Sequence, residues 1–556
     1  MFSIYFLYIT MFRLKQYTKQ EKQNYHNNKS FYSLIPLHIY QTWYTLDLPD
    51  KMRKNVEELK RDNPEFKHYL YDDKMCRDFI KSNFNEEVLW AFDKLKPGAY
   101  KADLWRYCIL YINGGIYLDI KFKCIDNFRL IELTEQEYWV KDIKRVINGI
   151  YQALMVTFPR NNILWKAIQE IVINCKNNLY SLNTLAVSGP TLLGQYFNEI
   201  DFNNLSLKNM GDIIVKNDVP ILQHYNEYRN EQKQKQKTSH YDFLWNMVDI
   251  FNYLILKPKN TLNISDKKDS IVNNNTITYF SSIPNIVEKD DLLYVYTEYC
   301  NECFHTNGIK NIVNTKEKTK FNIRKYDYDL KKKDSDIDFS FDEKTAHNLL
   351  VINFNNAIYY ITEHFNTRLN RLYFSSNKLD INDDIITFNY INEKQYRQPD
   401  AIYNNPVSFV NINDELVFIY NWYPLQLGTI DFEITRIKIN NILYNVPSFF
   451  KNIKNASYGV TIKDEIWFIL NINQTNYFNE SFIQNNKHLF AVFDLQMNFK
   501  QYSELFSFAD EKNEFCKSFI YKDDELIIGY GVSNKECYIA KYDFKDLCRS
   551  IRWFNE

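Results

Sequence analysis

The run KPGAYKADLWRYCILYINGGIYLDIKFKC, residues 96–124, decides the fold of the first half of the chain. After a Pro-Gly pair that suits a helix entry, apolar side chains recur at helical spacing through residues 99–112 and cover a wide surface, which indicates a helix buried between layers. Residues 113–115, Asn-Gly-Gly, end this helix because glycine takes the left-handed conformation at no steric cost. Through residues 116–123 the apolar period becomes two, which predicts a strand.

Two pairs of charged side chains in this run need an explanation. Asp103 and Arg106 are three residues apart and are therefore neighbours on the predicted helix. Asp119 and Lys121 share the polar face of the predicted strand. A charge inside an apolar helix is costly unless it is paired or used. One interpretation is a structural ion pair beside a strand with one solvated face, and the other is a functional site.

The order of the residues favours a site. From Ala102 to Ile120 the chain reads A-D-L-x-R-Y-x-I-L-Y-x-x-G-G-I-Y-L-D-I. This pattern closely resembles the signature of glycosyltransferase family 32, sugar-transferring enzymes with a DXD motif. The family includes the Och-type mannosyltransferases and enzymes of bacteria and large DNA viruses. One position departs from the pattern, because Lys121 stands where the family has its second acid.

The resemblance implies a domain of the GT-A type, with an α/β architecture, that takes a UDP- or GDP-linked sugar and transfers it with retention. It implies that Asp119 contacts the donor and shares a Mn²⁺ or Mg²⁺ ion, which usually bridges the diphosphate oxygens. It also implies that Asp103 and Arg106 hold sugar hydroxyls. Lys121 would repel a cation, yet its charge could itself neutralise phosphate.

Other segments match the family at single positions. Residues 34–43 form a predicted strand in which Gln41 and Trp43 match the donor side, although Tyr40 stands where histidine is usual. His240, shortly before Trp245, matches a histidine that can complete the metal site in the family, although a lone histidine is more often an ordinary residue. The remaining positions implied by the resemblance are Asp73, Gly114, Gly115, Tyr117 and Lys121 on the donor side, and Gly189 and Pro190 on the acceptor side.

Strands and helices alternate around this run. We predict helices at residues 50–61, 74–82 and 162–175, and strands at residues 67–71, 136–140 and 150–158. Such alternation is typical of a Rossmann-type, mainly parallel sheet with helices on both faces. In these sheets ligands bind at the carboxyl ends of the strands, where Asp119 would lie.

The second half of the chain repeats a short β pattern five times. Each copy is a polar two-residue turn that leads into an apolar strand, with a hairpin partner upstream. The copies start 50 to 65 residues apart, at residues 290–295, 355–360, 414–419, 464–469 and 524–529. Repeats of this length predict an all-β five-bladed propeller, and the alternative is an irregular β-sandwich.

Length and composition set the domain boundaries that we expect. A chain of 556 residues is too long for one core. We predict a disordered or weakly apolar segment at 1–30, a transferase domain at 31–255, a linker rich in Lys, Asn, Ser and Thr at 256–285, and the propeller at 286–556.

Charge and cysteine content bear on partners and location. A formal net charge of −1 provides no global field for nucleic acid. The apolar N-terminal stretch is shorter than the ~20 residues of a membrane span, so we predict no stable span and at most a weak anchor. The scattered cysteines suit reduced thiols in the cytoplasm, which for a viral enzyme is that of the host cell, or in the virion.

Three functional hypotheses follow from these patterns. The first is a glycosyltransferase that moves a sugar from a nucleotide-diphosphate donor to a glycan, protein or lipid acceptor. The second is a catalytically idle glycan-binding protein on a degenerate transferase fold. The third places a glycosidase or phosphorylase activity in the propeller, although no catalytic signature is visible there.

Overall fold

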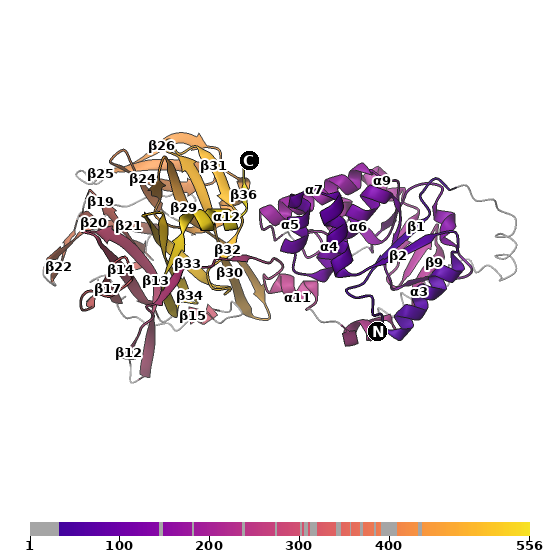
Figure 1. Ribbon diagram of the computed structural model, residues 1–556, viewed down its shortest axis with the longest axis horizontal. Coiled ribbons are helices and arrows are strands. Elements are labelled where there is room, and N and C mark those ends of the chain that lie inside the picture. The colour runs from indigo at the N-terminus through magenta and orange to yellow at the C-terminus, as the bar shows by residue number, and fades with distance from the viewer. Residues whose placement is uncertain are drawn as a thin grey trace. The chain divides into compact units, whose positions relative to one another are not determined.

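The computed structural model describes residues 33–143, 148–180, 183–235, 239–272, 275–300, 303–304, 310–311, 320–340, 346–355, 357–366, 371–382, 385–390, 408–431 and 436–555. The predicted disordered segment 1–30 lies outside them. The chain divides into two compact units (Figure 1). The first comprises Met1–Trp245 and Asp249–Asn252, and the second comprises Asn246–Val248 and Tyr253–Glu556.

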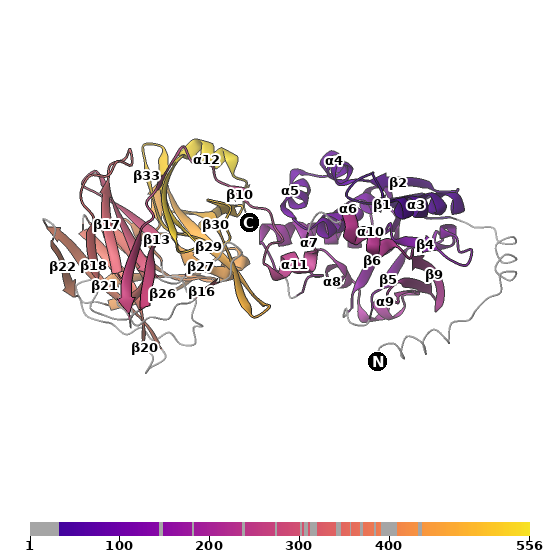
Figure 2. The same ribbon diagram turned by 90° about the horizontal axis from the view of Figure 1, so that it is seen from below.

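The first unit is built on one mixed sheet with helices packed beside it (Figure 2). The strand order is β2-β1-β3-β6-β5-β7-β8-β9-β4. The strands are β1 (His38–Thr42), β2 (Lys67–Tyr71), β3 (Gly115–Leu118), β4 (Phe122–Cys124), β5 (Tyr138–Lys141), β6 (Ile150–Thr157), β7 (Leu207–Asn209), β8 (Ile213–Lys216) and β9 (Val219–His224). The helices are α3 (Asp50–Asp62), α4 (Asp73–Asn83), α5 (Glu86–Lys94), α6 (Gly98–Asn113), α7 (Asn162–Lys176), α8 (Pro190–Gly194), α9 (Glu199–Asn203), α10 (Tyr228–Lys235) and α11 (Tyr241–Asn246).

The prediction of a mainly parallel sheet is wrong for the strands that follow β3 in the sheet order. Strand β1 pairs in parallel with β2 and β3, because α3 and then α4–α6 carry the chain back over the sheet between them. From β6 onward most neighbours run antiparallel, and only β5 and β7 add a parallel pair. The GT-A-like βαβ portion is therefore limited to the strands that carry the motif region.

Helix α6 confirms the buried helix predicted from the opening run. Its central residues, from Asp103 to Leu110, are all buried, and α7 packs against it. Gly114 caps its C-terminus with φ +62°, and the Gly114 amide donates to the Leu110 carbonyl. The apolar faces of β1, β3 and β6 close the core on the sheet side.

The second unit is all-β. Its described strands form five multi-stranded antiparallel sheets, with a single parallel pair between β10 and β32, and one small two-stranded sheet. The sheets are curled like half-barrels (Figures 1 and 2). In chain order, the first three contain β12 (Lys267–Val272), β13 (Asn275–Lys289), β14 (Leu292–Cys300), β17 (Lys320–Tyr326) and β18 (Ile337–Ser340); β19 (Ala346–Phe354), β20 (Ala357–Asn366), β21 (Arg371–Asn382) and β22 (Ile385–Tyr390); and β23 (Ser408–Ile412), β24 (Glu415–Trp422), β25 (Leu425–Asp431) and β26 (Arg436–Tyr444).

The last two sheets are built mainly from the C-terminal part of the chain. The fourth contains β27 (Ile453–Ala456), β28 (Val460–Ile462), β29 (Glu465–Phe478), β30 (Ser481–Asp494), β31 (Phe499–Ser503), β32 (Phe506–Ser507), β36 (Trp553–Phe554) and the early strand β10 (Leu254–Ile255). The fifth contains β33 (Glu514–Lys522), β34 (Glu525–Val532), β35 (Glu536–Asp543) and the early strand β11 (Asn260–Asn263).

The five predicted turn-and-strand copies are confirmed as hairpins. They are the pairs β13–β14, β19–β20, β23–β24, β28–β29 and β33–β34. Asn and Asp dominate the turns because they tolerate the left-handed backbone, and φ is +50° at Asp290, +51° at Asn355 and +59° at Asp524.

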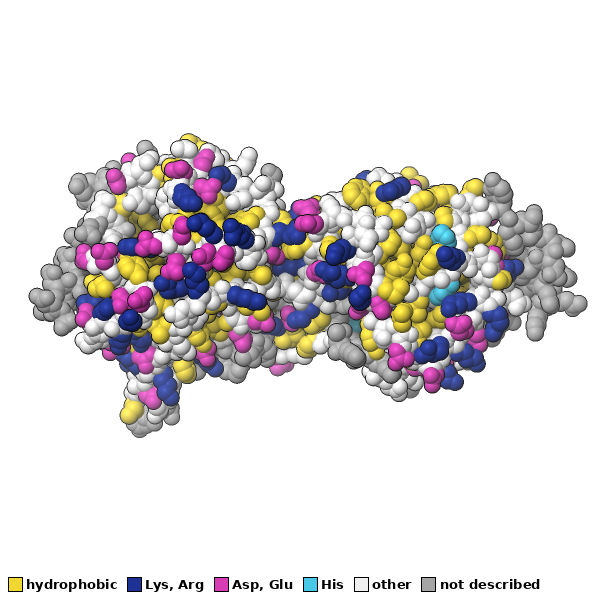
Figure 3. All heavy atoms as spheres, viewed as in Figure 1, with side chains coloured by type: hydrophobic (Ala, Val, Ile, Leu, Met, Phe, Trp, Pro, Cys, Tyr) yellow, Lys and Arg dark blue, Asp and Glu magenta, His cyan; other side chains and the backbone are white. Residues whose placement is uncertain are grey.

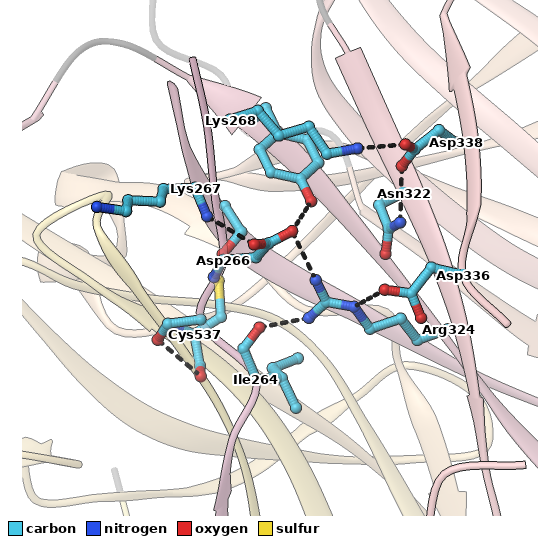
Figure 4. Close-up of polar contacts among 12 residues, drawn as sticks. Ile264, Asp266, Lys267, Lys268, Asn322, Arg324, Asp336, Asp338 and Cys537 are labelled. Atoms are coloured by element: carbon cyan, nitrogen blue, oxygen red, sulfur yellow. Dashed lines mark hydrogen bonds and ion pairs between the residues drawn. The ribbon is translucent and has the colours of Figure 1, made fainter. Parts of the chain in front are cut away.

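The predicted linker 256–285 is wrong, because most of its described residues lie in strands β11, β12 and β13. Strand β11 pairs with β35, and β12 pairs with β13. Figure 4 shows the polar contacts that hold the segment: Arg324 bonds to the Ile264 carbonyl, and its guanidinium reaches Asp266 at 3.3 Å and Asp336 at 3.1 Å. Backbone pairing and these buried ionic contacts replace the apolar periodicity that strand prediction relies on.

Candidate active site

The chain turns sharply at Asp119, directly after β3. The Asp119 amide donates to the Ala153 carbonyl of β6, and the Phe122 amide donates back to the Asp119 carbonyl at 3.1 Å. Strand β4 then pairs with β9, away from the strands beside β3. The predicted continuous strand 116–123 is therefore wrong, because this turn interrupts it at Asp119–Lys121.

The turn is fixed by a side chain that the sequence analysis missed. The Asn55 amide of α3, which is buried, donates to the carbonyls of both Ile120 and Phe122 at 3.0 Å. The Tyr225 amide donates to the Lys121 carbonyl at 3.0 Å. The sequence could have indicated Asn55, because it is the one polar residue on the buried face of α3 that Met52, Val56 and Leu59 form. These bonds give the turn one conformation.

Helix α6 places the side chains of Asp103 and Arg106 next to each other, close to the turn at Asp119. The two side chains are buried and lie 3.5 Å apart. The Arg106 guanidinium also lies 3.6 Å from the Asp119 carboxylate, donates to the Gln152 carbonyl at 3.2 Å and stacks over the Tyr117 ring at 4.4 Å. Arg106 thus links the helix to the turn, which the spacing of residues alone could not reveal.

Lys121 closes the other side of Asp119. Its ammonium nitrogen lies 2.6 Å from Asp119 Oδ2, while the Tyr117 hydroxyl donates to Oδ1 at 2.8 Å. The lysine side chain is 14% exposed, and its nitrogen lies 5.3 Å from the centre of the Tyr151 ring. The turn, and not a shared strand face, brings the two charges together.

Burial and charge shift the pKa values of both carboxylates. Burial alone would raise the pKa of Asp119, but Lys121 and then Arg106 outweigh it and hold the value well below its usual range. For Asp103 burial prevails over the attraction of Arg106 and the hydrogen bond from Ser188, and raises the pKa to about 7. Asp119 is therefore a permanent anion, whereas Asp103 changes charge near neutral pH.

The glycines after α6 are required by the backbone. At Gly115 φ is +105°, and an added Cβ would lie 2.8 Å from the His38 carbonyl oxygen of β1. A Cβ at Gly114 would lie 2.7 Å from Pro159. Close packing of β3 against its neighbours thus needs glycine at both positions, independently of any donor contact.

Gly115→Ala is expected to lower the free energy of unfolding by about 1–3 kcal/mol, because it forces a left-handed alanine against a backbone oxygen. Urea unfolding would measure the change. Gly98→Ala is the matched control, since a Cβ there meets nothing within 4 Å at the start of α6. The control should leave stability unchanged or raise it, and equal losses in both variants would contradict the packing argument.

The predicted donor-side residues lie at the ends of β1 and β2. Gln41 is fully buried, and its side-chain oxygen Oε1 lies 2.8 Å from the His68 ring nitrogen Nε2. Trp43 packs against the cluster that contains Ile120 and Tyr225, which also border the turn. Asp72 is the N-cap of α4, where its side chain accepts from the Met75 amide, and Asp73 is the first residue of the helix.

The acceptor-side residues reach the charged cluster through Ser188. The Ser188 hydroxyl donates to Asp103 Oδ2 at 2.8 Å, and its carbonyl accepts from the Tyr107 hydroxyl at 3.0 Å. Gly189 and Pro190 follow at once and start α8. Ser188 was not among the predicted site residues, although its place directly before Gly189 and Pro190 was the available signal.

A divalent metal does not fit these residues. In the described part of the chain, no group of three or more His, Cys, Asp or Glu side chains could hold one. The described contacts of His240 are with Asp242, at 3.4 Å, and the neighbouring Tyr241 ring, and half of its side chain is exposed. The Lys121 ammonium, 2.6 Å from Asp119 Oδ2, already supplies a cation to this carboxylate.

The charged cluster lies directly after the central strand β3 of the α/β unit, and the comparisons with known proteins cover this part of the chain. Residues 49–144 match the family model described as a glycosyltransferase sugar-binding region containing a DXD motif. This segment is therefore similar to the sugar-binding region of DXD-type glycosyltransferases.

Two curated relatives illustrate the match. A glycosyltransferase of Acanthamoeba polyphaga mimivirus is 42% identical over 96 residues, which cover 17% of this chain and 38% of that protein. Inositol phosphoceramide mannosyltransferase 2 of Schizosaccharomyces pombe is 30% identical over 165 residues, covering 30% of this chain and 46% of that protein. The chain thus spans less than half of each of these relatives.

Among solved structures, β-1,2-mannobiose phosphorylase of Listeria innocua aligns with 52% of this chain and 99% of its own, at 8% identity and a TM-score of 0.33. A likeness at this level assigns neither fold nor function.

Proposed function

We propose that this protein is a glycosyltransferase that moves a sugar from a nucleotide-diphosphate donor to a glycan, protein or lipid acceptor, with retention. The observation that carries the proposal is the charged cluster inside the matched segment, in which Asp103 and Arg106 are buried and Asp119 and Lys121 are partly exposed. The alternatives are an idle glycan-binding protein, which would use the same cluster without turnover, and a glycosidase or phosphorylase in the second unit, for which the described residues show no comparable charged cluster.

The cluster offers what sugar transfer needs. Asp119 is ionised and held on both oxygens, so it is pre-oriented to accept hydrogen bonds from the donor's sugar or ribose hydroxyls. Asp103 and Arg106 provide an acceptor and donors for further sugar hydroxyls beside it. Gln41, Trp43 and Asp73 are proposed for the nucleotide side, and Gly189 and Pro190 for the acceptor side.

Mannose is the sugar to test first, because the Schizosaccharomyces pombe relative is by name a mannosyltransferase. The test is a thermal-shift screen of GDP-mannose, UDP-glucose and related UDP- and GDP-sugars, with and without Mn²⁺, followed by an assay of donor hydrolysis. A ligand at 100 times its Kd stabilises by about 2.7 kcal/mol, which a thermal shift detects. If no nucleotide sugar binds, the proposal fails; binding without turnover would favour the idle protein.

For the second unit we propose a five-bladed propeller that binds the glycan acceptor. Support comes from the five antiparallel sheets in chain order among the described residues and from β11, which completes the sheet of the last strands. A cavity of about 570 Å³ lies against β13, β19 and β33. Its lining includes Glu288, Asn353, Tyr458 and Tyr521, polar and aromatic groups suited to sugar hydroxyls and ring faces.

The surface and the cysteines bear on partners and location. The face of the second unit in Figure 3 mixes acidic and basic side chains, a distribution that does not favour nucleic acid as a partner. None of the helices in the described part of the chain is long and apolar enough to cross a bilayer. We propose a cytoplasmic location, including that of a virus-infected cell, supported by the eight free cysteines of the described residues.

A further inference from the structure

We infer that Lys121 serves as a built-in cation that takes the place of the divalent metal, so that donor binding and transfer need no metal. The inference rests on the proposed glycosyltransferase function and concerns the same site. It starts from one departure: a region matched as containing a DXD motif reads Asp119-Ile120-Lys121 in this chain.

Both carboxylate oxygens of Asp119 already have a partner in the protein. Asp119 Oδ2 is taken by the Lys121 ammonium at 2.6 Å, and Oδ1 accepts from the Tyr117 hydroxyl at 2.8 Å with Arg106 at 3.6 Å. A metal bound to Asp119 Oδ2 would have to displace Lys121 from this largely buried ion pair, in which the two side chains are 14% and 21% exposed. Separating such a pair is unfavourable, because it leaves a poorly solvated charge without its partner.

Charge balance supports the same conclusion. With both carboxylates ionised, Asp103 and Asp119 carry two negative charges, and Arg106 and Lys121 carry two positive charges, so the set is neutral. With aspartate at position 121 the same set would carry two excess negative charges, which one divalent ion would neutralise. In the chain as it stands the set has no excess negative charge for a divalent ion to neutralise, and protonation of Asp103, whose pKa burial raises to about 7, makes it less anionic still.

The ammonium is held where it could act. The turn that carries it is fixed by Asn55 and Tyr225, and the Tyr151 ring lies 5.3 Å from the nitrogen. Burial would lower the pKa of Lys121, but Asp119 outweighs it and keeps the pKa above its ordinary value, so the charge persists at neutral pH. An ammonium has three N–H donors, so it can hold Asp119 and still donate to a phosphate oxygen.

Sugar transfer balances without a metal. The bond between the anomeric carbon and the diphosphate oxygen breaks, and its electron pair leaves with the diphosphate. A bond forms between the anomeric carbon and the acceptor oxygen, whose hydroxyl proton passes to the departing diphosphate. Lys121 stabilises the negative charge on that leaving group through a charge-assisted hydrogen bond.

The first experiment measures Mn²⁺ binding alone, by electron paramagnetic resonance, in the full-length chain. We expect no bound Mn²⁺ at the site in the wild type and one bound ion in Lys121→Asp. Lys123→Asp, two residues later and within β4, is the matched control and should not gain it. A wild-type Mn²⁺ site that Asp119→Asn removes would overturn the inference, whether or not the protein proves to be a transferase.

The second experiment follows donor hydrolysis in EDTA. The wild type and Lys121→Arg, which keeps the positive charge, should be insensitive to EDTA, whereas Lys121→Asp should become dependent on added Mn²⁺. Loss of wild-type hydrolysis in EDTA with recovery in Mn²⁺ would refute the built-in cation. Absence of hydrolysis under every condition would instead refute the proposed function, and the Mn²⁺-binding result would still decide the role of Lys121.

Discussion

Asp119→Asn is expected to lower donor hydrolysis and transfer by about 10²–10³-fold, because it removes the one permanently ionised carboxylate of the cluster. The asparagine keeps the shape of the side chain but loses its charge, so Lys121 and Arg106 are left without the anion that orients them. Steady-state rates with the nucleotide sugar identified by thermal shift would measure the loss.

The rate comparison is meaningful only if the Asp119→Asn variant is folded. Circular dichroism and the Tm of the variant report on folding separately from the rate. Asp201→Asn, on the exposed surface of α9, is the control and should leave the rate unchanged. A folded Asp119→Asn protein with the wild-type rate would remove Asp119 from the site and with it the main support for the assignment.

Arg106→Met is expected to lower the free energy of unfolding by about 3–5 kcal/mol, because it leaves two buried carboxylates with one cation. The loss should be greatest above the pKa of Asp103, which burial raises to about 7, and smaller below it, where Asp103 is protonated and needs no partner. Chemical denaturation at several pH values would measure both effects.

Two further variants define the origin of that loss. Arg61→Met removes a guanidinium from an exposed pair with Asp62 and should cost less than about 1 kcal/mol. Adding Asp103→Asn to Arg106→Met should restore part of the stability, since the uncompensated charge then disappears. If the double variant is no more stable than Arg106→Met at high pH, buried charge is not the cause.

The residues around the opening run determined much by themselves. The apolar spacing and the glycine pair predicted α6 and its end, because helix periodicity and left-handed backbone are local properties. The polar turns before apolar strands predicted the five hairpins for the same reason. The order of Asp103, Arg106 and Asp119 also selected three residues that the structure brings together, although not their geometry.

Only the tertiary structure decided how the charges meet. Asp119 and Lys121 were predicted on one strand face, but the strand ends at Asp119 because β4 pairs with the distant β9. Asn55 and Ser188, each tens of residues away in sequence, complete the site through hydrogen bonds that no local pattern encodes. Backbone conformation depends mainly on neighbouring residues, so the sequence predicts it. The contacts of a charged side chain depend on how distant segments pack, and here the turn between β3 and β4 places Lys121 against Asp119.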